Sequence, residues 1–97
     1  MKLIITPKIR EKLANKEPPV SEEEIRQCFG NQTHRAVLDT REQHKTDPLT
    51  RWFVSETDHG RKLKIMYVPD PAGIFIKSAY NATEEVQRIY KERALPL

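Results

Sequence analysis

Apolar and polar residues alternate most regularly in the second half of the chain. Three runs carry this pattern: residues 50–57, 61–68 and 74–80. Each run is rich in β-branched and aromatic residues, and Gly, Pro or Asp marks its boundaries. In the second run, Leu63 and Ile65 alternate with Lys62 and Lys64. Because successive side chains of a strand point to opposite faces, we predict an antiparallel meander with an apolar face and a basic outer face.

Helical spacing replaces this alternation in three other segments. Thr6-Pro7 suits the start of a helix that ends before Pro18-Pro19, because proline fits a first helical turn and disfavours helical geometry in its predecessor. Ser21 and Glu24 have the spacing of a capping box, and Ile25, Cys28 and Phe29 share one face of the helix that follows. A last helix begins after Asn81 or Thr83 and presents a 3–4 spaced stripe to the sheet.

We therefore predict one α+β domain over residues 1–97, with N-terminal helices, an antiparallel sheet of about four strands and a C-terminal helix packed on the sheet. Residues 35–39 form the first strand of the sheet proper, and residues 1–5 form a short edge strand or an extended arm. Residues 39–48 read as a polar, charged connection. Cys28 in its apolar stripe is interpreted as a small core residue.

Composition narrows the partners and the compartment. Charged residues make up 32% of the chain and the net charge is +3, which is compatible with a polyanionic partner. The lone Cys28 excludes an internal disulfide and favours a reducing cytoplasm. No apolar run approaches the ~20 residues of a membrane span, so no membrane partner is expected. The amino end also lacks the apolar segment of a secretory signal.

Several kinds of chemistry find no support in the residue spacing. The chain has no Cys-x-x-Cys, His-x-x-x-His or His-Glu-x-x-His pattern, so we expect no metal. Its three glycines cannot build a Walker A loop or a dinucleotide fingerprint, so we expect no cofactor. No Gly-x-Ser-x-Gly or Cys/His arrangement indicates nucleophilic catalysis.

What remains is a set of cations on neighbouring strands. We predict that Arg51, Lys62, Lys64 and Lys77 share one face of the sheet, where they would hold phosphate groups by charge. His44, and with less support His59, would titrate near neutrality and serve as acid or base. The competing interpretations are solubilising surface lysines, a turn residue at His59 and an incidental loop residue at His44. Trp52 is interpreted as a core residue in preference to a base-stacking platform.

Taken together, the segments resemble the BrnT-type toxins of bacterial type II toxin–antitoxin systems, which belong to the RelE-like ribonuclease superfamily. The match runs from about Lys12 to Tyr90. It rests on the order of Lys12 to Lys16, Val20-Ser-Glu-Glu23, Phe29, Asn31, Asp39, Glu42, Arg51, Gly60-Arg61, Ile74-x-Ile-x-Ser-Ala79, Ala82-Thr83, Glu85 and Tyr90. The chain is also similar to a set of small bacterial proteins with the Asp39-Thr-Arg-Glu-x-His44 run and the Trp52-Phe53 strand.

The resemblance implies a sheet flanked by helices, metal-free cleavage of RNA through attack of the ribose 2′-hydroxyl, and neutralisation by an antitoxin protein encoded beside it. Under this hypothesis Arg51, Lys64 and Lys77 hold phosphate, Arg61 supports the groove, and His44 or Tyr80 moves a proton. The family often has an arginine directly after Ser-Ala, where this chain has Tyr80. A missing arginine removes a charge-assisted contact to phosphate.

Two alternatives stay open at this point. The first is a non-catalytic interaction domain of the same fold that binds an acidic partner or nucleic acid, which Tyr80 in place of arginine favours. The second is a small-molecule hydrolytic site formed by Asp39, Arg41, Glu42 and His44.

Overall fold

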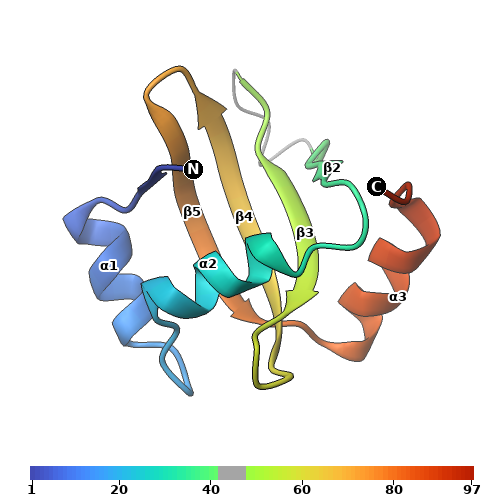
Figure 1. Cartoon of the computed structure of the whole chain (residues 1–97), viewed down its shortest axis with the longest axis horizontal. Coiled ribbons are helices and arrows are strands. Elements are labelled where there is room, and N and C mark those ends of the chain that lie inside the picture. Colours follow the sequence, from blue (N-terminus) through green and yellow to red (C-terminus); the bar gives the residue numbers. More distant parts are fainter. Residues whose placement is uncertain (42–47) are drawn as a thin grey trace.

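Five strands in the described part of the chain form one sheet, in the order β1-β5-β4-β3-β2 (Figure 1). The structure is a computed structural model that describes residues 1–41 and 48–97. The strands are β1 (Leu3–Ile4), β2 (Val37–Leu38), β3 (Arg51–Glu56), β4 (Lys62–Asp70) and β5 (Gly73–Asn81). The predicted meander is confirmed in β3, β4 and β5, which pair antiparallel and in sequence order.

The sheet differs from the prediction in its strand number and pairing and in the register between two of its strands. The sheet has five described strands and is mixed, because β1 pairs parallel with β5 through Leu3 opposite Ile74. Parallel neighbours need a long connection, and here α1, α2 and the strands β2, β3 and β4 lie between β1 and β5 along the chain. The ladder between β4 and β5 also shifts register after Met66, so that Lys77 has no directly paired residue on β4.

Each helix begins at the kind of cap that the sequence predicts. Helix α1 (Pro7–Ala14) has Thr6 as its N-cap, and α3 (Glu84–Arg93) has Thr83. In α2 (Glu22–Gly30) the capping box is complete, because the Glu24 N–H donates to Ser21 Oγ at 3.1 Å and the Ser21 N–H donates to Glu24 Oε1 at 3.0 Å. These caps satisfy amide groups that have no partner within the helix.

The sheet has two covered faces, which we call the α2 face and the α3 face. On the α2 face, Phe29 packs edge-on against Phe53 with ring centroids 4.8 Å apart. On the α3 face, Tyr90 lies 5.6 Å from Trp52. Figure 1 shows α2 crossing the sheet and α3 flanking it beside β3. The predicted α+β class, with a C-terminal helix packed on the sheet, is confirmed.

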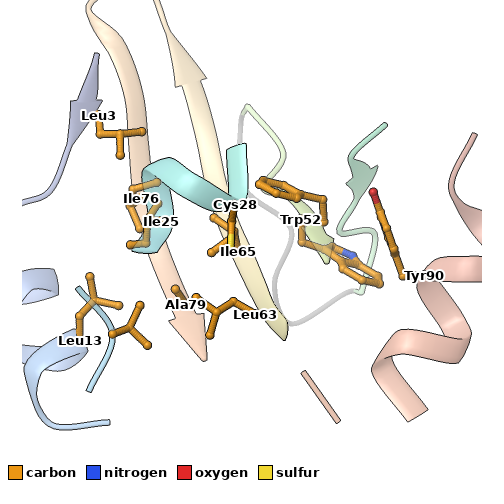
Figure 2. Close-up of a cluster of buried hydrophobic side chains, with 12 residues drawn as sticks. Leu3, Leu13, Ile25, Cys28, Trp52, Leu63, Ile65, Ile76, Ala79 and Tyr90 are labelled. Atoms are coloured by element: carbon orange, nitrogen blue, oxygen red, sulfur yellow. The ribbon is translucent and has the colours of Figure 1, made fainter. Parts of the chain in front are cut away.

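The core fills the space between α2 and the central strands. Ile25, Cys28, Leu63 and Ile65 have no exposed surface, and Figure 2 shows them gathered beneath α2. Cys28 is thus a core residue, as predicted. Burial raises the pKa of its thiol to about 12, which keeps the sulfur protonated and unreactive. Trp52, only 6% exposed, is a core residue too.

Candidate functional site

The predicted basic outer face does not exist as one surface. Directly paired residues of neighbouring strands share a face, and Lys64 pairs with Val54 and Tyr80. Arg51 lies three residues from Val54 along β3, so its side chain points to the opposite, α2 face, where it pairs with Tyr67. The expectation that Arg51 and Lys64 share a face is therefore wrong.

Lys64 is instead enclosed on the α3 face, where only 7% of the residue is exposed. Its ammonium lies 4.6 Å from the centroid of the Trp52 ring and 5.7 Å from that of Tyr80. Aromatic faces attract a cation but accept no strong hydrogen bond from it. Within residues 1–41 and 48–97, Lys64 makes no hydrogen bond or ion pair to a carboxylate. The stem of Lys64 is thus buried, and within the described part of the chain its ammonium has donors that are free to bind an anion.

Lys64 lines a cleft of about 300 Å³ between β3, β4, α3 and the segment after β2. We call this the Lys64 cleft. Among the described residues, its lining consists of Asp39, Thr40, Arg41, Trp52, Lys64, Glu85, Val86, Ile89 and Arg93. In this described lining, three cationic groups face two acidic ones. Such a volume suits a small anion or one unit of a longer polyanion.

Arg41 is held in the wall of this cleft by Asp39. The Arg41 Nε and Nη2 atoms donate to the two carboxylate oxygens of Asp39 at 3.0 and 2.9 Å, and the Arg41 N–H donates to Oδ1 at 3.2 Å. Asp39 is only 3% exposed. Hydrogen bonding to Asp39 raises the pKa of Arg41 above its usual value, against the opposing effect of burial. The pair fixes a guanidinium group beside Lys64.

Arg93 completes the cationic lining from the last turn of α3. Its Nη2 atom donates to the Leu38 carbonyl at 3.3 Å, which ties the helix to β2. Glu85, in the first turn of the same helix, also lines the cleft. Among the described residues, no histidine lines the cleft.

Tyr80 lies next to Lys64 on the neighbouring strand. The two residues are directly paired between β4 and β5, so their side chains share the α3 face. A second cation, Lys16 Nζ, lies 5.4 Å from the Tyr80 ring centroid. The structure thus brings together two of the predicted site residues, Lys64 and Tyr80.

The other predicted site residues lie elsewhere. Arg51 is on the α2 face, where burial raises the pKa of Tyr67 and the charge and hydrogen bonding of Arg51 oppose that rise. Lys77 is exposed at the register shift of β5. His44 and Glu42 lie outside the described residues. His59 is in the turn between β3 and β4, as its structural interpretation predicted.

Arg61 is part of the framework. Its guanidinium donates to the Pro18 and Pro19 carbonyls at 2.7 Å each, to both Glu24 oxygens at 3.1 Å and to Asn81 Oδ1 at 2.7 Å. These contacts lock the start of α2 to the ends of β4 and β5. The charge of Arg61 is already matched by Glu24, so a role in supporting an RNA groove finds no geometric basis.

Sequence reasoning did not assign Arg41 and Arg93 to the phosphate site. The sequence does contain an indication for Arg41, because an aspartate two residues before an arginine permits the bidentate contact seen between Asp39 and Arg41. Arg93 had a weaker one, since it ends the apolar stripe of α3. Only the three-dimensional structure shows that both line the same cleft as Lys64.

The fold and the cleft define a small α+β protein with a cationic cleft between a sheet and its C-terminal helix. Searches against protein-family models, curated proteins and solved structures found no match to the chain. In the described residues, no helix is long and apolar enough to cross a membrane.

Proposed function

We propose that this protein is a toxin-like, RNA-directed domain of a bacterial type II toxin–antitoxin system, and that it binds an RNA phosphate in the Lys64 cleft. The observation that carries the proposal is Lys64, a residue only 7% exposed whose ammonium lies over the Trp52 ring, with Arg41 and Arg93 in the same lining. A phosphate oxygen supplies the acceptor that the aromatic rings do not. The resemblance described above adds the RNA substrate and the antitoxin partner.

Cleavage at this cleft would follow a metal-independent route. The ribose 2′-hydroxyl gives its proton to solvent and its oxygen attacks the adjacent phosphorus, the bond from phosphorus to the 5′ oxygen breaks, and the 5′ oxygen takes up a proton. A cyclic phosphate and a 5′-hydroxyl result. Lys64 would stabilise the negative charge that develops on the phosphate oxygens. Tyr80, whose ring centroid lies 5.4 Å from Lys16 Nζ and 5.7 Å from Lys64 Nζ, would donate a proton to the leaving oxygen and regain it from solvent.

The alternative is a non-catalytic domain that binds nucleic acid or an acidic partner through the same cleft. Tyr80 favours it, because the resembled family often has an arginine at this position and an arginine would add a charge-assisted contact to phosphate. This hypothesis predicts salt-sensitive binding of nucleic acid or an acidic partner, without RNA cleavage and without growth arrest when the protein is expressed.

The test measures RNA binding and cleavage for Lys64→Met and a matched control. Methionine keeps a long apolar side chain against Trp52 and removes the charge, whereas Lys8→Met makes the same change at an exposed position of α1. Loss of one charge-assisted contact should weaken binding about tenfold to hundredfold for Lys64→Met and little for Lys8→Met. The single tryptophan, Trp52, reports occupancy by its fluorescence.

The outcomes separate the two readings. Cleavage and growth arrest that Lys64→Met abolishes support the toxin-like domain, and binding without cleavage supports the non-catalytic one. If Lys64→Met binds a single-stranded oligoribonucleotide as tightly as the unchanged protein, the cleft is not the RNA site.

A further inference from the structure

Strand β3 has an open outer edge beyond its short pairing with β2. The two strands pair only through Val37 with Trp52 and Leu38 with Arg51. The Asp39 N–H donates to the Thr50 carbonyl at 2.7 Å, which shows that the backbone groups of Thr50 face β2. Backbone groups of alternate residues point to the same side of a strand. The N–H and C=O groups of Val54 and Glu56 therefore also point away from β4.

The segment that precedes β2 turns away from this edge. The Arg35 N–H donates to the Leu95 carbonyl at 2.7 Å, and the Leu97 N–H donates to the Thr33 carbonyl at 3.2 Å. Residues 33–35 thus pair with the C-terminal tail and not with β3. In residues 1–41 and 48–97, the outward Val54 N–H donates no hydrogen bond to this segment and the Val54 carbonyl accepts none from it, whereas the Glu56 carbonyl accepts one from Asn31 Nδ2 at 3.0 Å.

These backbone groups open into a groove of about 800 Å³, which we call the β3-edge groove. One wall carries Asn31, Thr33 and His34, and the other carries Gln87, Tyr90 and Lys91 of α3. The Tyr90 hydroxyl holds the two walls together by donating to the His34 and Arg35 carbonyls at 2.9 and 3.1 Å. An open strand edge is a template for another strand.

The walls decide which occupant fits. A single extended segment can lie beside Val54 between the two walls, whereas the edge of a second copy would bring its own flanking helices against them. The charged side chains of the groove also bear on which occupant fits. Both acidic side chains already have a contact: Lys62 lies 4.0 Å from Glu56, and Asn31 Nδ2 donates to Asp58 Oδ1 at 2.9 Å. Lys91 makes no ion pair within the described residues, so the α3 wall offers a cation to the occupant.

We propose that the β3-edge groove binds an extended segment of a partner polypeptide, which pairs its backbone with Val54 and Glu56 and places a carboxylate against Lys91. Main-chain hydrogen bonds supply the attraction, and the walls select which side chains are accepted. This site is distinct from the proposed RNA site, because the β3-edge groove and the Lys64 cleft share no described lining residue.

The test uses a short capped peptide of alternating valine and threonine with one central glutamate. We expect the amide protons of Val54 and Glu56 to exchange quickly in the free protein and to become protected when the peptide is added. Two N-methylated versions serve as matched probes, one for each alternating set of peptide amides. Methylation of the set that faces β3 should weaken binding about three- to tenfold per lost hydrogen bond, and methylation of the other set should not.

Variants of the protein address the same point. Val54→Pro removes the outward N–H but no bond of the β3–β4 ladder, and Val54→Thr is its control. Lys91→Glu should weaken binding of the peptide with the central glutamate and should leave binding of the peptide with glutamine at that position unchanged. Equal binding of both N-methylated peptides, or unchanged exchange at Val54 and Glu56 in excess peptide, would overturn the proposal. Self-association that Val54→Pro abolishes would identify a second copy as the occupant and would overturn it as well.

Discussion

At the scale of single residues, Arg61 shows how a cation that looks functional in the sequence can be structural. Its side chain is 19% exposed, and its donors are shared among Glu24, Asn81 and the Pro18 and Pro19 carbonyls. Arg61→Met leaves those acceptors without their charged partner. We expect a loss of about 2–4 kcal/mol in the free energy of unfolding, measured with urea.

Arg10→Met is the control for this prediction. Arg10 makes an ion pair with Glu22 at 3.2 Å, but its side chain is 60% exposed. An exposed pair contributes about 0.5 kcal/mol or less. If both substitutions cost the same, the contacts of Arg61 do not hold the molecule together as described.

Glu24 gives this network a pH dependence. Burial alone would raise the pKa of its carboxyl group, but hydrogen bonds from Ser21 and Arg61 outweigh burial and lower it below the usual value near 4.5. The folded-state pKa is thus below that of the unfolded chain. The ionised carboxylate therefore stabilises the fold above about pH 4.5, and this contribution disappears as the pH falls through the lowered pKa.

The corresponding experiment compares the unchanged protein with Glu24→Gln in urea unfolding at several pH values. Glu24→Gln should be less stable near neutral pH and should lose less stability on acidification. A stability difference between the two proteins that stays constant from pH 7 to pH 3 would contradict the assigned shift.

At the scale of elements, the attachment of β1 to β5 depends on Gly73. The Ile74 N–H donates to the Lys2 carbonyl at 2.9 Å. A Cβ atom on Gly73 would lie 2.7 Å from that carbonyl oxygen, and the residue has a φ of +150°. Gly73→Ala should displace β1, destabilise the protein by about 1–3 kcal/mol and speed amide exchange at Ile74.

Gly60→Ala separates backbone strain from the steric clash. Gly60 also has a positive φ, +84°, but nothing lies within 4 Å of its added Cβ atom. Gly60→Ala should lower the free energy of unfolding by about 1 kcal/mol and should not change amide exchange at Ile74. Faster amide exchange at Ile74 in both variants would mean that the effect of Gly73→Ala does not come from the close approach of the Lys2 carbonyl.

Elements with a long pattern were predictable from the sequence in extent and packing, whereas the short strands were predictable only in position. Residues 1–5 were expected as an edge strand or an extended arm and residues 35–39 as a strand, and β1 and β2 lie within these ranges. The capping box and the alternation of Leu63 with Lys64 each involve several positions and predict α2 and β4 correctly. Strand β1 has two residues, too few for alternation to show, and its parallel pairing depends on a distant segment. The connection after Asp39 holds the predicted His44, which lies outside the described residues.

At the scale of the whole molecule, helices pack on both faces of the sheet. Strand β3 therefore lacks the alternation of apolar and polar residues that would show which face each cation takes. Trp52 and Phe53 are neighbours on β3, yet both are buried, one under α3 and the other under α2. A strand that is apolar on both faces does not reveal which side its cations take. For this reason the face of Arg51 could not be inferred from the sequence, whereas that of Lys64 followed from β4.

The two-sided arrangement also gives the sharpest test of where a polyanion binds. Arg51→Met and Lys64→Met each remove one positive charge and keep an unbranched side chain, but they act on opposite faces of the sheet. A cation that contacts a phosphate of single-stranded RNA contributes about 0.7 to the slope of log affinity against log salt concentration. A cation on the far face acts only through a field that salt screens beyond about 10 Å. We therefore expect Lys64→Met to lower the slope by about 0.7 and Arg51→Met to leave it unchanged, as measured by fluorescence anisotropy from low to moderate salt. Equal reductions in both variants would mean that the RNA path includes the α2 face and is not confined to the Lys64 cleft.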